Sequence, residues 1–161
     1  MDAILQYKSI IEAEAARTRI PPSVIGAILA NELRFGWIQD PKDTVASLLK
    51  DPTDVSTGIG QIKPWRARTI DQAFNRTPCD DEEYRRKLSD PRVNIAYIAD
   101  YALFNQQNAS LMLLDGFDRT NDYHWLGVIQ GHNTGFPKVR KWDPYASQSL
   151  RNMRYLYTNV W

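Results

Sequence analysis

One acidic residue occupies a position where the helical pattern of the sequence calls for an apolar side chain. Ile25, Ile28 and Leu29 recur at helical spacing, and Glu32 is the next residue on the same stripe. Burial disfavours the charged form of a carboxyl group and raises its pKa, as a general acid working near neutral pH requires. The competing interpretation is a structural carboxylate at the edge of the core, paired with an arginine or capping a backbone. Glu32 is therefore the first candidate for chemistry.

Two short polar segments are the next candidates. In residues 56–64, Gly58 and Gly60 permit positive φ or close backbone approach, and Gln61 follows with an amide that both donates and accepts hydrogen bonds. Residues 132–135 place an asparagine two residues before a glycine. Taken alone, the first segment is better explained by a tight turn before a helix, and the second is compatible with a helix that ends in a left-handed glycine. Only their combination with Glu32 points to a site.

Helices must position these residues, because helical spacing of apolar residues dominates the chain. A short helix over 110–115 is also considered, and residues 51–62 predict a small β-hairpin or an irregular loop. The proline pair at 21 and 22 ends the first helix and opens the second. The predicted helices span residues 2–17, 21–35, 44–50, 64–74, 81–88, 91 to at least 103, 121–131 and 147–158.

The helix that begins at Pro91 is predicted to be the central buried one. Asp90 is a suitable N-cap, and proline is tolerated in a first helical turn. Apolar residues then cover more than half of the circumference of the helix. Tyr97 and Tyr101 lie four residues apart and so share a face. The chain thus predicts one mainly α domain over residues 1–161.

Composition excludes several classes of function. The chain has 161 residues, 43% of them hydrophobic, and a formal net charge of +1, so bulk binding of nucleic acid is not expected. Arginines cluster at 66 and 68, 85 and 86, and 151 and 154, and we interpret these clusters as solvated surface. No apolar run approaches the roughly 20 residues of a membrane span, and no secretory signal is visible at the N-terminus.

Cysteine and histidine usage argues against a disulfide and against a metal. Cys79 is the single cysteine, so an internal disulfide is impossible, and its acidic neighbours disfavour a reactive thiolate. His124 and His132 lie eight residues apart without an accompanying carboxylate motif. We therefore expect neither a metal nor another cofactor.

In order and spacing, the candidate segments resemble the lytic transglycosylase and goose-type lysozyme group of the lysozyme-like superfamily. The matching positions are Glu32 at a helix end, residues 58–61, Asn94 with Ile95 in the central helix, and residues 132–135. The resemblance extends from about Tyr7 to Trp142. It implies a single lysozyme-like catalytic domain that cleaves the β-1,4 bond between the muramic acid and glucosamine units of peptidoglycan.

Residue roles follow from the resemblance position by position. Glu32 becomes the general acid that protonates the glycosidic oxygen. The residues implied for contact with the glycan strand are Thr57, Gly58, Gln61, Tyr97, Tyr101, His132 and Asn133. Aromatic rings suit sugar faces, since they offer flat apolar area with a polar rim. For the two tyrosines, packing in the core of the central helix is an equal alternative.

The chain also departs from the family pattern. Leu33 stands where a serine commonly follows the catalytic glutamate, and Gly60 replaces a methionine, which we expect to open one wall of the groove. His132 replaces a tyrosine and adds a group that normally titrates near neutral pH. Asp54 is the best second carboxylate, although it is also explained as a turn residue. The choice between hydrolysis and formation of an anhydro sugar therefore stays open.

Three other functions are also considered for this sequence. The same fold acts on chitin or chitosan in related enzymes, or the domain has lost activity and only binds glycan. A helix-turn-helix arrangement over 17–33 is disfavoured, since that segment is poor in basic residues. A wall-cleaving enzyme without a secretory signal needs a non-classical route to the bacterial cell wall, in the periplasm or outside the cell. The expected origins are a phage lysis or tail protein, an injected effector, or one domain of a longer chain. We expect a monomer, and an injected effector would have a cognate immunity or inhibitor protein as its partner.

Overall fold

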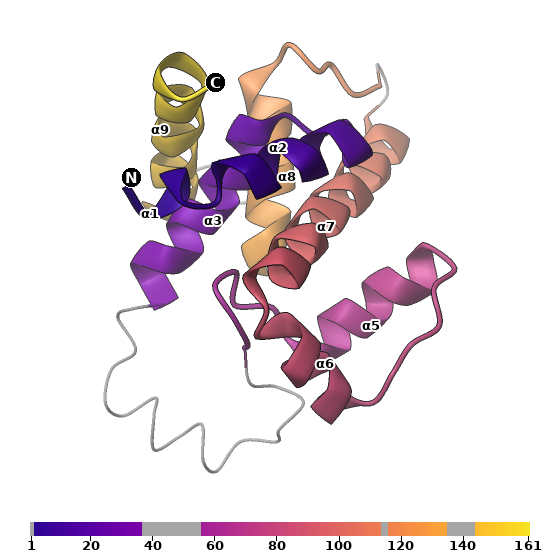
Figure 1. The fold of residues 1–161 in the computed structure, drawn as a ribbon. Coiled ribbons are helices and arrows are strands. Elements are labelled where there is room, and N and C mark those ends of the chain that lie inside the picture. Colours follow the sequence, from indigo (N-terminus) through magenta and orange to yellow (C-terminus); the bar gives the residue numbers. More distant parts are fainter. Residues whose placement is uncertain (1, 37–55, 114–115, 135–143) are drawn as a thin grey trace.

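The computed structural model describes residues 2–36, 56–113, 116–134 and 144–161, and these are mainly α-helical (Figure 1). The described part contains no β-sheet, and its only strand-like pairing is an antiparallel bridge between Thr57 and Ile62. The helices are α1 (Asp2–Leu5), α2 (Lys8–Thr18), α3 (Pro22–Gly36), α5 (Pro64–Ala73), α6 (Asp81–Leu88), α7 (Pro91–Met112), α8 (Asp122–Thr134) and α9 (Pro144–Asn159). The mainly α fold class predicted from the sequence is confirmed.

Most helix boundaries agree with the prediction, and the exceptions have local causes. The predicted first helix is divided into α1 and α2 at Tyr7, whose φ of −104° and ψ of 6° leave the helical region. Apolar periodicity continues across this turn, since Ile4 and Ile11 are both buried, so the pattern alone cannot reveal it. The short predicted helix over 44–50 lies outside the described residues.

The prediction of a separate short helix over 110–115 is wrong, because α7 continues without a break to Met112. The polar side chains near its C-terminal end form hydrogen bonds to backbone carbonyls of the same helix. Asn108 Nδ2 donates to the Phe104 carbonyl at 2.9 Å, and Ser110 Oγ donates to the Gln106 carbonyl at 2.8 Å. Bonds of this kind let Asn and Ser remain within a helix that their propensity alone would not favour.

The start of α7 follows the sequence signal closely. Asp90 caps the helix by accepting a hydrogen bond from the Arg92 amide at 2.8 Å, and Pro91 occupies the first helical position. The helix then contacts α2, α3, α5, α6 and α8. Its expected place as the central buried helix is confirmed.

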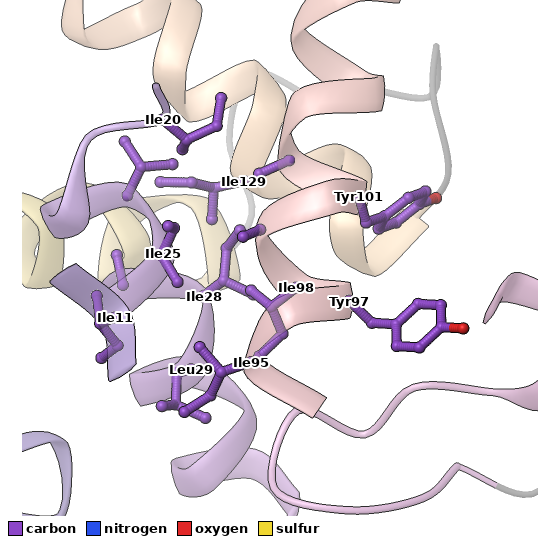
Figure 2. Close-up of a cluster of buried hydrophobic side chains, with 14 of the residues drawn as sticks. Ile11, Ile20, Ile25, Ile28, Leu29, Ile95, Tyr97, Ile98, Tyr101 and Ile129 are labelled. Atoms are coloured by element: carbon purple, nitrogen blue, oxygen red, sulfur yellow. The ribbon is translucent and has the colours of Figure 1, made fainter. Parts of the chain in front are cut away.

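The core lies where α2, α3, α7 and α8 meet (Figure 2). The α3 stripe of Ile25, Ile28 and Leu29 is fully buried and faces Ile95 and Ile98 of α7. Complete burial of such a side chain stabilises a protein by about 1.5–3 kcal/mol. This cluster fixes the direction of α3 and therefore the position of the residues at its C-terminal end.

None of the described helices combines the length and the apolar composition that crossing a bilayer requires.

Cys79 is a free, half-buried thiol. Lys87 Nζ lies 3.7 Å from its sulfur.

Candidate active site

Glu32 sits near the C-terminal end of α3, with 14% of its side chain exposed. Its Oε1 accepts a hydrogen bond of 3.0 Å from the hydroxyl of Tyr145 in the first turn of α9. The two residues are 113 positions apart in the chain. The packing of α9 against α3 therefore creates this contact.

A buried polar network holds α9 at the end of α3. Asn31, which is fully buried, donates from Nδ2 to Ser149 Oγ and accepts at Oδ1 from Asn152 Nδ2 at 2.8 Å. Ser149 Oγ in turn donates to the Tyr145 carbonyl at 2.6 Å. Buried amides of this kind are costly unless paired, so the network specifies one arrangement of the two helices. It positions the residue that bonds Glu32.

The C-terminal end of α8 brings His132 to the same place. His132 Nε2 lies 4.0 Å from Glu32 Oε1 and 3.4 Å from the Gly60 carbonyl oxygen. The ring of His132 packs edge-on against Tyr101, with 5.4 Å between the ring centroids. The site therefore joins α3, α7, α8, α9 and the turn before α5.

Arg66, in the first turns of α5, completes the cluster. It donates from Nη1 to the His132 carbonyl and lies over the ring of Tyr101, 4.8 Å from its centroid. The expectation that Arg66 belongs to the solvated surface is wrong, because the residue is half-buried and its Nε is sequestered from solvent. A stacked guanidinium of this kind supplies a fixed positive charge at the site.

Burial raises the pKa of Glu32 to about 7, while the Tyr145 hydrogen bond and the positive charge of Arg66 oppose this rise. A large fraction of Glu32 is thus protonated at neutral pH. Burial and the Arg66 charge lower the pKa of His132 to about 3. The expectation that His132 titrates near neutral pH is therefore wrong. Near neutral pH the contact between His132 and Glu32 is not an ion pair.

The glycine segment forms a tight turn fastened to the start of α7. Asn94, fully buried, donates to the Thr57 carbonyl at 3.0 Å and the Leu88 carbonyl at 2.9 Å, and accepts from the Gly60 amide at 2.7 Å. Gly58 has a φ of +71°, and a Cβ there would lie 2.1 Å from the Leu88 carbonyl oxygen. The predicted need for positive φ and close approach is confirmed at this glycine.

Gly60 was expected to open one wall of a groove and Gln61 to contact the glycan, but their side-chain positions face the protein itself. A Cβ on Gly60 would lie 2.5 Å from Asn94 Oδ1, so a side chain there would point into α7 and would not form the wall of a groove. Gln61 adopts the left-handed region with a φ of +49°, and its Nε2 donates to the Gly58 carbonyl at 2.9 Å. The half-buried Gln61 amide is thus engaged within its own turn.

The two tyrosines of α7 have separate roles, although both project away from the apolar cluster (Figure 2). Tyr101 lies at the site, with its hydroxyl 3.2 Å from the Gly131 carbonyl oxygen. Tyr97 does not. Its hydroxyl donates to Asp71 Oδ2 at 2.8 Å, and Tyr84 donates to the same oxygen at 2.7 Å. Of the two interpretations of Tyr97, the structure supports the structural one.

Other predicted site residues are placed only in part. Thr57 pairs with Ile62 at the base of the turn. Asn133 belongs to the last turn of α8, and its side chain lies outside the described part of the structure. Asp54 also lies outside it. Among the described residues, no group of three or more His, Cys, Asp or Glu side chains has an arrangement that would hold a metal ion.

The site can therefore supply one proton donor in a largely dehydrated setting, with a tyrosine and a guanidinium ready to stabilise the carboxylate that remains. Comparison with protein-family models, with curated proteins and with solved structures finds no match to the chain. The functional assignment consequently depends on this geometry and on the motif pattern of the sequence.

Proposed function

We propose that the chain is a lysozyme-like muramidase that cleaves the β-1,4 bond between the muramic acid and glucosamine units of peptidoglycan, with Glu32 as the general acid. The observation that supports this proposal best is the state of Glu32. The carboxyl is mostly buried, bonded to Tyr145 at 3.0 Å, and has a pKa raised to about 7. Such a carboxyl donates a proton near neutral pH, as glycoside cleavage requires.

The proposed reaction begins when protonated Glu32 transfers its proton to the glycosidic oxygen. The bond from that oxygen to the anomeric carbon breaks, and the leaving sugar departs as an alcohol. The Glu32 carboxylate is then stabilised by the Tyr145 hydroxyl and by the charge of Arg66. An oxygen nucleophile attacks the anomeric carbon while Glu32 takes its proton, which regenerates the acid.

Two nucleophiles are compatible with this scheme. Water would make the enzyme a lysozyme, and the 6-hydroxyl of the muramic acid unit would make it a lytic transglycosylase with an anhydro product. One carboxylate is sufficient for the second route, because the substrate supplies the nucleophile.

Substitution of Glu32 by glutamine tests the proposal directly. Glu32→Gln keeps the shape of the side chain and removes the proton source, so release of soluble fragments from purified sacculi should fall by at least about a hundredfold. Glu82→Gln, on the exposed surface of α6, is the matched control and should retain full activity. Equal activity of Glu32→Gln and the wild-type chain would refute the role of Glu32.

Product analysis then separates the possible reactions. Mass spectrometry of fragments from sacculi distinguishes reducing ends, made by hydrolysis, from anhydro ends, made by transglycosylation. Parallel digestion of soluble chitin oligomers tests the alternative polymer. Binding of the wild-type chain to sacculi without release of any fragment would instead identify an inactive glycan-binding domain.

A further inference from the structure

A cavity lies at the opposite end of the helices that carry the candidate active site. It has a volume of about 470 Å³ and lies between the start of α3, the turn that precedes α8, and the last turns of α9. Glu32, His132 and Tyr145 lie at the other ends of these three helices, whose course is visible in Figure 1. The volume falls within the usual range of small-molecule sites.

The cavity is separate from the Glu32 site. Val24 lines it, and Glu32 is eight residues further along α3, which corresponds to a rise of about 12 Å. No residue that lines the cavity contacts Glu32 through a hydrogen bond or an ion pair among the described residues. A ligand bound here would not occupy the proposed catalytic position.

The base of the cavity is apolar and buried. Trp125, with 3% exposure, lies beside the buried side chains of Val24 and Met153. The indole Nε1 of Trp125 is already used, since it donates to the Arg119 carbonyl at 2.8 Å. Tyr157, 73% exposed, lines the rim. This lining suits a flat or branched apolar body.

Two polar groups of the lining are not fully satisfied within the described part of the chain. Ser23 is only 4% exposed, and its hydroxyl makes no hydrogen bond to another described residue. Arg119 stacks on Trp125, 5.3 Å from the ring centroid, and donates from Nη2 to the Arg19 carbonyl. No described carboxylate forms an ion pair with it.

The other arginine of the lining is compensated. Arg154 Nε forms an ion pair with Asp122 Oδ2 at 2.8 Å. Among the described residues that line the cavity, the exposed Arg119 therefore carries the one positive charge without an ion-pair partner, and the lining also holds the Ser23 hydroxyl and an apolar base. A ligand with a single negative charge matches this lining better than a phosphate, which carries close to two charges at neutral pH.

We infer that this cavity binds a small monocarboxylate with an apolar body. The carboxylate would accept hydrogen bonds from the Arg119 guanidinium and the Ser23 hydroxyl, a charge-assisted pairing that guanidinium geometry favours. The apolar body would lie on Trp125 and Met153, with Tyr157 over its outer side. Both a free aromatic acid and the C-terminal carboxylate of a short peptide possess this chemistry.

Matched acids and amides test the inference. 3-Phenylpropionic acid and N-acetyl-D-alanyl-D-alanine represent the two sources, and the corresponding amides remove only the charge. Titrations followed by NMR at the indole N–H of Trp125, assigned with Trp125→Phe, should show at least one acid binding about tenfold more tightly than its amide. Equal binding of acid and amide in both pairs, or no change at Trp125, would overturn the inference.

Variants then identify the groups responsible. Arg119→Gln should abolish the preference for the acid, whereas Arg151→Gln, on the exposed side of α9 outside the cavity, should preserve it. Tyr157→Ala should weaken acid and amide by the same factor. If Arg119→Gln fails to fold, as judged by circular dichroism, Ser23→Ala decides, because a reduced acid preference supports the inference and an unchanged one contradicts it. Binding should be unaltered by Glu32→Gln, so this result is independent of the proposed activity.

Discussion

The protonation of Glu32 reflects the balance between burial and two contacts that favour its charged form. Burial is the larger effect and raises the pKa of Glu32 to about 7 from its ordinary value of 4.5. The Tyr145 hydrogen bond and the Arg66 charge oppose it. At pH values where such a buried carboxyl ionises, it lowers the free energy of unfolding. This loss of stability is measurable without any substrate.

The stability of the protein should therefore depend on pH through Glu32. Below the unfolded pKa of 4.5 both states hold the Glu32 proton, whereas between 4.5 and about 7 the unfolded chain releases it first, so the contribution of Glu32 to stability falls as pH rises through this window. One pKa unit corresponds to about 1.4 kcal/mol, so this fall is about 3 kcal/mol. The lowered pKa of His132 acts in the opposite direction over an overlapping window, because the unfolded chain holds the imidazole proton more tightly than the folded one. The effect of Glu32 is therefore measured against a variant: in urea unfolding, Glu32→Gln should gain about 3 kcal/mol of stability relative to the wild-type chain between about pH 4 and about pH 8.

Removal of the Tyr145 hydroxyl should alter the pH profile of activity. Tyr145→Phe deletes the hydrogen bond to Glu32 Oε1, so the pKa of Glu32 rises further. One such bond is worth about 1 kcal/mol, which shifts the basic limb of the rate profile upward by up to about one pH unit. Tyr155→Phe, exposed on the same helix, serves as the control. A superimposable profile for Tyr145→Phe would mean that this hydroxyl does not act through Glu32.

At the residue scale, the sequence identified the candidate acid and not the groups around it. Glu32 was visible because a charge interrupts an apolar stripe. Tyr145 and Arg66 carry no such signal, since their place depends on the packing of α9 and α5. His132 was found, but its low pKa was not, because complete burial is a property of the folded molecule.

At the element scale, the turn over 57–62 depends on one side chain of α7. Asn94 makes hydrogen bonds to the backbone of Thr57, Gly60 and Leu88. Asn94→Ala should lower the free energy of unfolding by about 2–3 kcal/mol, since it leaves buried backbone groups unpaired. Urea unfolding measures the loss, and Asn108→Ala, whose amide bonds only within its own helix, is the control. Equal stability of the two variants would contradict the role assigned to Asn94.

The helices themselves were largely predictable, because apolar periodicity and proline or aspartate signals mark their starts. The Asp90 cap and Pro91 start of α7 illustrate this. The break at Tyr7 and the continuation of α7 through Ser110 were not predictable, since they depend on burial on both sides of a turn and on side chains that bond within the helix.

At the scale of the whole molecule, an ionic network of two buried aspartates and two exposed arginines joins α2, α5 and α7. Arg76 forms ion pairs with Asp71 at 2.9 Å and with Asp100 at 2.8 Å, and Asp100 also pairs with Arg17 of α2 at 2.7 Å. Tyr97 donates to Asp71 within the same network. These residues tie the α5 and α6 region to the rest of the fold.

Tyr97 should thus contribute to stability and not to catalysis. Tyr97→Phe removes one hydrogen bond to a buried carboxylate and should lower the free energy of unfolding by about 1.5–3 kcal/mol. The rate of fragment release from sacculi, measured below the unfolding transition, should be unchanged. A large loss of activity at unchanged stability would instead indicate that Tyr97 contacts the glycan.

The overall arrangement of helices could not be derived from the sequence, because long-range pairs determine it. Asn31 and Ser149 are 118 residues apart, and neither has a distinctive local pattern. The sequence predicted helices packed around a central helix. Which helix ends lie together is seen only in the folded chain.

The position of this Asn31 network along α9 has a mechanical consequence. Ser149 and Asn152 fasten α9 to α3 between Tyr145 at one end of the helix and Tyr157 at the other. The same bonds therefore set two distant positions at once, that of the Tyr145 hydroxyl against Glu32 and that of Tyr157 at the distant cavity.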